Sequence, residues 1–307
     1  MLSATAGVTA LVAVLGIGLA SATFDPAPRS SPGVSVCPTR EQSVPNTDEP
    51  VEVDRSDPAV PIWSDEFDSP MGTPIDPARW WIETGGLGWG EEELQAYTDS
   101  RANVGYSGTG DLVITARREP GEGGARYTSA RVSTCGTFEF TSGRVEARMR
   151  LPEGQGLWPA FWLLGARQPW PQYGEIDIME SINDMSVVEF NTHQPLPDGT
   201  DWEKSSASPV HPSGSWANDY HVFAVDWRAD SLEWSVDGTV YARTTRSDTP
   251  AGGAWVIDES PQIIVLNLAV GGYPGAPDAT TPFPAELRID WVRVYANADT
   301  DVTRQLT

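Results

Sequence analysis

Residues 174–180 read Gly-Glu-Ile-Asp-Ile-Met-Glu and carry three carboxylates, Glu175, Asp177 and Glu180. In a β-strand, side chains two residues apart share a face, so Glu175 and Asp177 point to one side and the isoleucines to the other. Glu180 lies an odd number of residues from Glu175, so in a regular strand it would face the core. We expect a one-residue bulge near Met179, which would return Glu180 to the face of the other two carboxylates.

The close spacing of these carboxylates also predicts a chemical property. Three neighbouring carboxylates repel one another, so at least one should keep its proton near neutral pH. One ionised and one protonated carboxylate beside a cleft can cleave a glycosidic bond. A solvated acidic strand edge would have the same spacing, so the flanking sequence has to distinguish the two interpretations.

The rest of the chain has the pattern of an all-β protein. Gly and Pro are frequent, short runs alternate in polarity, and long amphipathic helical repeats are absent. A 307-residue chain can form one large β domain with additional segments. The pattern predicts a β-sandwich with strands at 112–116, 143–149 and 221–227, and a tight hairpin of 232–236 and 239–241 around Asp237-Gly238.

Aromatic-rich segments surround the acidic strand in a characteristic order. They are WSDEF at 63–67, YTSAR at 127–131, GLWPAFWLL at 156–164, WP at 170–171, NLAVGG at 267–272 and DWVRVY at 290–295. Together with EIDIME, this ordered set resembles glycoside hydrolase family 16, in its bacterial endo-β-1,3-glucanase (laminarinase) branch. The resemblance covers about residues 61–295. It implies a jelly-roll sandwich of two curved antiparallel sheets with a concave substrate cleft.

The resemblance also implies the roles of the three carboxylates. Glu175 matches the family's nucleophile and Glu180 its general acid/base, with Asp177 in a supporting role between them. Such a pair hydrolyses its substrate with retention, through a covalent glycosyl-enzyme. Asp177 would share a hydrogen bond with a neighbouring carboxyl group and so help to separate the two pKa values.

Several aromatic residues are candidates for sugar binding. We expect four indole rings to stack on the C–H faces of pyranose units. They belong to Trp158 and Trp162, which the motif places at the cleft, to Trp170, and to Trp89 in a Gly-rich loop. The alternative for each is a place in the core, where large aromatic side chains usually pack. The chain has 13 tryptophans, too many for all of them to contact substrate.

Polar side chains complete the expected cleft. The resemblance places His193, on the strand after the acidic one, in the cleft near the acid/base. Arg131 and Asn103 resemble residues that hold substrate hydroxyls, although either one could instead satisfy backbone groups in a bend.

A structural calcium ion is the only metal that the resemblance implies, and catalysis is expected to need no cofactor. The ion would lie on the convex side, with the backbone carbonyls of Glu66 and Gly110 and the side chain of Asp290 as ligands. Oxygen ligands suit a hard cation, but Asp290 could instead cap a strand end.

The N-terminal region predicts export. Residues 1–22 are apolar and small and end in Ala-Ser-Ala, as in a secretory signal peptide, with a membrane anchor as the alternative. Residues 23–60 form a Pro- and Ser-rich linker or extended arm, 61–297 the catalytic domain and 298–307 a C-terminal tail. We therefore expect a secreted, extracellular protein, without membrane attachment once the signal is removed.

The cysteine count fits this compartment. Cys37 in the arm and Cys135 in the domain are the only two cysteines. In a secreted chain, an even pair suggests a disulfide that fastens the arm to the sandwich, and the alternative is two unrelated thiols.

The net charge of −23 excludes an electrostatic nucleic-acid binder and indicates solubility rather than substrate. The sequence favours a monomeric, retaining endo-β-1,3-glucanase that acts on laminarin-like or cell-wall β-glucans. Alternatives are a hydrolase of the same fold that cleaves mixed-linkage β-1,3-1,4-glucan, agarose or carrageenan, or a non-catalytic glucan-binding protein. The extra residue Met179 argues against the dedicated mixed-linkage branch, and the presence of Glu175 and Glu180 argues against the non-catalytic protein.

Overall fold

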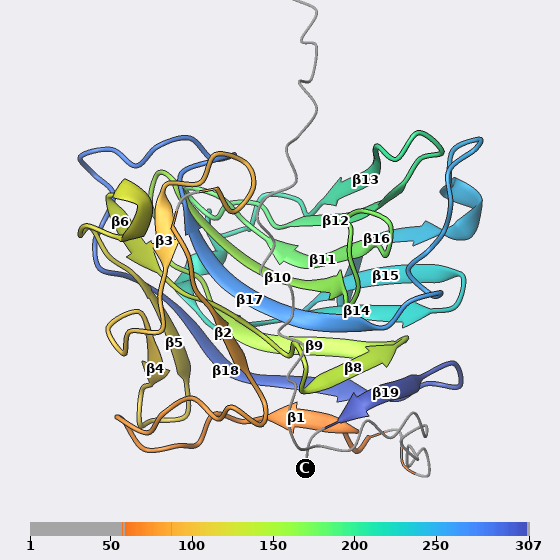
Figure 1. Cartoon of the computed structure of the whole chain (residues 1–307), viewed down its shortest axis with the longest axis horizontal. Coiled ribbons are helices and arrows are strands. Elements are labelled where there is room, and N and C mark those ends of the chain that lie inside the picture. The colour runs from red at the N-terminus through yellow and green to blue at the C-terminus, as the bar shows by residue number, and fades with distance from the viewer. Residues whose placement is uncertain (1–56, 58, 87, 306–307) are drawn as a thin grey trace, which may run out of the picture. The chain divides into compact units, whose positions relative to one another are not determined.

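The computed structural model describes residues 57, 59–86 and 88–305, and it confirms the predicted all-β sandwich (Figure 1). Two large antiparallel sheets, here called sheet A and sheet B, make up the described domain. Within these residues no helix has the length and apolar character needed to cross a membrane.

Sheet A has the hydrogen-bonded order β16-β15-β14-β9-β18-β5-β4, and β1 also pairs with β18. Its strands are β1 Trp63–Asp65, β4 Val104–Tyr106, β5 Leu112–Ala116, β9 Gly143–Arg150, β14 His221–Arg228, β15 Ser231–Val236, β16 Thr239–Thr245 and β18 Ala285–Tyr295.

Sheet B has the order β13-β12-β11-β10-β17-β7-β2; β8 pairs with β17, and β19 with β8. Its strands are β2 Trp81–Glu83, β7 Arg131–Ser133, β8 Phe138–Thr141, β10 Leu157–Gly165, β11 Glu175–Glu180, β12 Glu189–Pro195, β13 Asp201–Ala207, β17 Gln262–Val270 and β19 Asp301–Gln305. In Figure 1 the long strands β10 and β17 run side by side and curve together.

The remaining elements are short. Strand β3 (Gln95–Tyr97) pairs in parallel with β6 (Tyr127–Ser129). Three 3₁₀ turns, η1 Glu122–Gly124, η2 Trp216–Asn218 and η3 Arg246–Asp248, lie in the connections.

The strands that alternation predicted are present, as is the hairpin between β15 and β16. Asp237 and Gly238 at its turn both have positive φ, 48° and 76°, as the Asp-Gly signal requires. One expectation differs from the structure. Residues 298–307 were expected to form a tail, but 301–305 form β19, which pairs with β8 and buries Val302 in the core. A five-residue strand at a sheet edge has too little alternation to be distinguished from a polar tail.

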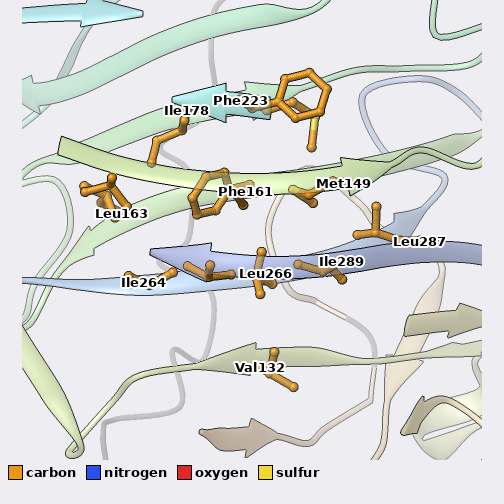
Figure 2. Close-up of a cluster of buried hydrophobic side chains, with 14 of the residues drawn as sticks. Val132, Met149, Phe161, Leu163, Ile178, Phe223, Ile264, Leu266, Leu287 and Ile289 are labelled. Atoms are coloured by element: carbon orange, nitrogen blue, oxygen red, sulfur yellow. The ribbon is translucent and has the colours of Figure 1, made fainter. Parts of the chain in front are cut away.

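The core lies between the two sheets. Figure 2 shows side chains from both sheets meeting there, among them Phe161, Ile178 and Leu266 of sheet B and Met149 and Phe223 of sheet A. All five are fully buried. The inward residues of β9 alternate with half-exposed ones, as expected for a sheet with one face in the core.

The predicted bulge is present in β11. Against β10, Phe161 pairs with Met179 and Trp162 with Asp177, so Ile178 has no partner in the register. The pairing with β12 shifts between Asp177 and Glu180 as well. Ile178 and Met179 are consecutive and both fully buried in the core. The bulge thus turns Glu180 to the same face as Glu175.

Sheet A supports this bulge through one buried hydrogen bond. The indole Nε1 of Trp234 on β15 donates to the backbone carbonyl of Asp177 at 2.9 Å, across the core. Trp234 is 1% exposed, so the bond is shielded from water. A buried carbonyl that loses its donor pays a desolvation penalty of about 1–3 kcal/mol.

Trp234→Phe should therefore lower the free energy of unfolding by about 1–3 kcal/mol beyond its packing loss, and should reduce activity. Trp227→Phe is the matched control, because Trp227 is equally buried but its Nε1 has no hydrogen-bond partner within the described residues. Urea denaturation and turnover of both variants check the prediction. Equal losses of stability with activity retained in both would contradict it.

Candidate active site

The site is built on three adjacent strands of sheet B, β10, β11 and β12. Glu175 lies opposite Leu164 on β10 and His193 on β12, and Asp177 lies opposite Trp162 and Asn191. The antiparallel register thus gathers carboxylates, indoles, an amide and an imidazole on one face of the sheet. This face is the one turned away from the core, because the alternate residues Ile176 and Leu163 pack inside.

Glu175 is held by an indole and an imidazole. Trp170 Nε1 donates to Glu175 Oε2 at 2.9 Å, and His193 Nε2 lies 3.9 Å from Oε1. Burial and the neighbouring Asp177 raise the pKa of Glu175 above its usual value, while His193, Trp170 and Arg131 act in the opposite direction. These groups oppose the shift but do not cancel it, so the pKa of Glu175 stays raised, at about 8.

Glu180 has a different pair of donors. Trp158 Nε1 donates to Oε1 at 2.9 Å, and Asn191 Nδ2 donates to Oε2 at 2.6 Å. Burial and the charge of Glu175 raise the pKa of Glu180 to about 7. Glu180 can therefore hold a proton near neutral pH, as a general acid must.

Asp177 lies between the two glutamates and is 3% exposed. Burial and the charge of Glu180 raise its pKa, and hydrogen bonds to His193 and Glu175 oppose the shift. Burial and mutual repulsion raise the pKa values of all three carboxyl groups to about 7 or 8. The three carboxyl groups therefore hold fewer than three negative charges at neutral pH.

His193 lies in this cluster, but not where the resemblance implied. Its nearest carboxylate oxygens are Asp177 Oδ2 at 3.4 Å and Glu175 Oε1 at 3.9 Å, rather than those of Glu180. The strand register explains the difference, since His193 pairs with Glu175 and Asn191 lies beside Glu180. Burial alone would lower the pKa of His193, but hydrogen bonds to Asp177 and Asp201 outweigh it and hold the pKa well above its usual value.

Arg131 and two tryptophans form a group beside the carboxylates. The Arg131 guanidinium lies 4.6 Å from the ring centre of Trp162 and 5.5 Å from that of Trp89, and its Nε is 3.0 Å from Glu83 Oε2. Trp162 Nε1 donates to Asn267 Oδ1 at 2.7 Å. One face of Trp162 is thus covered by Arg131, which leaves less of this ring for a sugar than the sequence suggested.

The interpretation of Asn103 as a substrate-binding residue was wrong. Asn103 is 1% exposed, and its Nδ2 donates to the carbonyl of Thr115 and to Thr128 Oγ1 at 2.9 and 3.0 Å. It also accepts from Thr98 Oγ1 at 2.6 Å. With these partners Asn103 fastens buried segments together, which is the alternative that the sequence left open.

Of the three residues expected at a calcium site, Glu66 follows β1 and Asp290 lies in β18, and the side chains of both have protein partners. Glu66 accepts two hydrogen bonds from Arg293, at 3.0 and 2.7 Å, and Asp290 pairs with Arg148 at 2.5 Å. An arginine neutralises a carboxylate as a cation would, so Arg148 would share Asp290 with any bound ion. Arg293 donates to the side chain of Glu66, whereas the expected calcium ligand is the backbone carbonyl of that residue.

Two groups on this face of sheet B have oxygen and nitrogen atoms close enough to hold a metal ion. They are Glu175, Asp177 and His193, and His193, Asp201 and Glu203. His193 already pairs with Glu175, Asp177 and Asp201, and Glu203 is exposed and accepts a hydrogen bond from Ser205. We therefore assign them no metal.

Sequence reasoning missed several residues of the cleft. Asn191 lies two residues before His193, so strand alternation could have placed it on the same face. Asp201 lies on β13, the strand that follows β12, and Asn267 lies on β17, far away in sequence; strand pairing brings both to the site. Tyr273 is 58% exposed and packs edge-on against Trp158, with ring centres 5.7 Å apart.

Comparison with known proteins agrees with this geometry. Residues 92–293 match the model of the family described as glycosyl hydrolases family 16. A β-glucanase of Rhodothermus marinus is 41% identical over 257 residues, which is 79% of this chain and 88% of that protein. The laminarinase catalytic domain of Thermotoga maritima superposes with a TM-score of 0.69 at 41% identity, covering 78% of this chain and 98% of that one. The structure of an endo-β-1,3-glucanase of Pyrococcus furiosus superposes with a TM-score of 0.68 at 41% identity, covering 77% of this chain and 94% of that one.

The sandwich fold, the pair of carboxylates on β11 and these relatives together identify the protein as a glycoside hydrolase. The chain belongs to glycoside hydrolase family 16. Hydrolases of this family need no cofactor for catalysis.

The raised pKa values predict how stability varies with pH. The folded protein holds a proton on Glu180 up to about pH 7, whereas the unfolded chain loses it near 4.5. The unfolded state therefore binds fewer protons between these values, and stability falls as pH rises through this window. His193, with its raised pKa, contributes in the same direction.

Glu180→Gln should flatten this dependence. Between pH 5 and pH 8, the melting temperature of the variant should fall less than that of the wild type. The amide nitrogen of the new glutamine cannot accept the hydrogen bond from Trp158 or from Asn191. That loss lowers stability equally at every pH and does not change the slope. Glu259→Gln, at an exposed site, controls for the change in net charge. If both variants show the wild-type slope in calorimetry, the buried proton on Glu180 is contradicted.

Proposed function

We propose that this hydrolase is a retaining endo-β-1,3-glucanase that acts on laminarin-like or cell-wall β-glucans. The observation that carries the proposal is the arrangement of β11. There the bulge brings Glu175 and Glu180 to one face, and each carboxylate accepts a hydrogen bond from a different indole. The relatives named above, a β-glucanase and two β-1,3-glucanases, support the polymer.

The proposed reaction has two displacements. A Glu175 oxygen attacks the anomeric carbon as the bond to the leaving oxygen breaks, and Glu180 donates its proton to that oxygen. In the second step Glu180 takes a proton from water, whose oxygen attacks the anomeric carbon and releases Glu175. Each displacement inverts the anomeric carbon, so the two steps together retain its configuration.

The electrostatics of the site support this exchange of roles. The charge of Glu175 is one cause of the raised pKa of Glu180. When Glu175 becomes a neutral ester, that charge disappears and the pKa of Glu180 falls. The protonated acid of the first step thus becomes the carboxylate base of the second step.

A neutral polymer fits the character of the cleft. Trp158, Trp162, Trp170 and Trp89 are all half-buried, so each keeps part of its ring accessible to a sugar. With a net charge of −23, the protein would repel a sulfated galactan such as carrageenan. Mixed-linkage glucan is neutral too, so only direct comparison of substrates separates it from β-1,3-glucan.

The test is the release of reducing sugar from laminarin, lichenan, agarose and carrageenan, measured side by side. We expect laminarin to be the best substrate, with the β-anomer as the first product in NMR. Glu175→Gln should lower turnover by orders of magnitude and leave the fold intact. An initial α-anomer would contradict the retaining mechanism, and preference for another polymer would contradict the assigned substrate.

Trp158 offers a prediction that separates its ring from its hydrogen bond. Trp158→Ala should lower kcat/KM on laminarin at least about tenfold, or about 1.4 kcal/mol, because it removes both the sugar platform and the donor to Glu180. Trp158→Phe keeps an aromatic ring and removes only the donor, so it should lower kcat with little change in KM. Steady-state kinetics of both variants provide the check. Wild-type kcat/KM in Trp158→Ala would remove Trp158 from the site.

We further propose that the chain is secreted, with residues 1–22 as its signal peptide and a disulfide between Cys37 and Cys135. Residues 1–22 and Cys37 lie outside the described residues. Cys135 is buried beside Leu164, Ile263 and Val265, next to Trp162 and Trp170. A bridge there would fasten the arm near the cleft, and thiol titration of the denatured, non-reduced protein tests it.

We also propose that a calcium ion binds through the carbonyls of Glu66 and Gly110 and the side chain of Asp290. Support comes from the family resemblance, while the Arg148–Asp290 pair competes with the ion. Calorimetry with calcium and with a chelator tests the site. We further propose that the protein acts as a monomer, which light scattering tests.

A further inference from the structure

His193 has two ring nitrogens with different surroundings. Its Nδ1 lies 2.7 Å from Asp201 Oδ2 on β13, and its Nε2 faces Asp177 and Glu175 on β11. The imidazole thus bridges from β13, across its own strand β12, to the catalytic strand. Trp170 packs beside it, with ring centres 5.9 Å apart.

The side chain of Asp201 has His193 Nδ1 as its hydrogen-bond partner. Its side chain is 19% exposed, and within the described residues its second oxygen, Oδ1, is buried without a hydrogen-bond partner. Of the acidic residues on β13, Glu203 lies directly opposite His193 but is exposed and accepts a hydrogen bond from Ser205 instead. A buried carboxylate whose one partner is a ring nitrogen is well placed to fix the orientation and tautomer of that ring.

We propose that Asp201 is a positioning residue, which holds the Nδ1–H of His193 so that Nε2–H is directed at Asp177 and Glu175. It contacts neither substrate nor the reacting atoms. It acts through His193, whose imidazolium then supplies positive charge to the pair of carboxylates that contains the proposed nucleophile. The kinetic meaning of this assignment rests on the proposed function of Glu175.

The charge balance explains what the imidazolium contributes. Glu175 and Asp177 face His193 from β11, and Asp201 and Glu203 face it from β13; Arg131 acts on Glu175 from the other side. Burial and mutual repulsion favour protonated carboxyl groups in this cluster, yet a nucleophile must be ionised. A fixed cation 3.4–3.9 Å from Asp177 and Glu175 offsets part of that penalty.

The kinetic test compares Asp201→Asn with Glu203→Gln. Each variant removes one negative charge from β13 near His193, but only the first removes the carboxylate from Nδ1. We expect Asp201→Asn to lower kcat about tenfold or more with little change in KM, as for a displaced group in the site. In the wild type Glu180 sets the alkaline limb of kcat/KM. In Asp201→Asn this limb should move to lower pH, because His193 without Asp201 loses its proton early enough to add a second limit. Glu203→Gln should keep the wild-type profile.

Equal pH profiles for the wild type and Asp201→Asn would overturn the proposal, as would equal shifts in the two variants, since the latter would indicate general electrostatics. The polymer that the enzyme degrades best serves as substrate, so a failure of the β-1,3 assignment does not affect this comparison. Circular dichroism of each variant confirms that it is folded.

NMR of the wild-type protein tests the geometry without any variant or substrate. The chain has three histidines, so their ¹⁵N ring signals can be assigned one by one. As pH rises, His193 should lose the proton on Nε2 and keep the one on Nδ1. A neutral His193 protonated on Nε2 with a bare Nδ1 would overturn the proposal, whatever the kinetics.

Discussion

One additional residue in β11 determines the geometry of the whole site. Because Ile178 and Met179 both turn into the core, Glu180 returns to the face that carries Glu175. The core fixes this arrangement from the opposite side, through the packing of Ile178 and the hydrogen bond from Trp234 to Asp177. A strand without the bulge would bury Glu180 among apolar side chains, so the chemistry depends on a local irregularity that both sheets stabilise.

The bulge creates an electrostatic problem, because it gathers three carboxyl groups where little water reaches them. The residues around Glu180 and around Glu175 offset this repulsion and burial in different ways. Glu180 has neutral donors, Trp158 and Asn191, and keeps its proton to about pH 7. Glu175 has Trp170 with His193 and Arg131 nearby, which favour its anion. The two glutamates thus differ in their neighbours on β12: the register pairs Glu175 with His193, whereas Glu180 accepts a hydrogen bond from Asn191.

The sequence predicted what depends on local alternation or on a specific motif. Strands β5, β9 and β14, the Asp-Gly hairpin and the bulge in β11 all follow from period-two patterning and its one interruption. The partners of the cleft residues could not be found in this way. Asp201 and Asn267 reach the site through strand pairing, and Asn103 resembles a binding residue until its neighbours Thr115 and Thr128 are known. Long-range register is a property of the fold, which single-strand patterns do not contain.

The central claim is that Glu175 carries the sugar during the reaction, while Glu180 moves the proton. Incubation with an activated 2-deoxy-2-fluoro glycoside of a laminari-oligosaccharide, followed by peptide mass spectrometry, tests this most directly. The fluorine destabilises the oxocarbenium-like transition states and slows hydrolysis of the glycosyl-enzyme enough to trap it. The account predicts one sugar attached to Glu175. A label on Asp177 or Glu180, or inactivation-free turnover with no label, would contradict it.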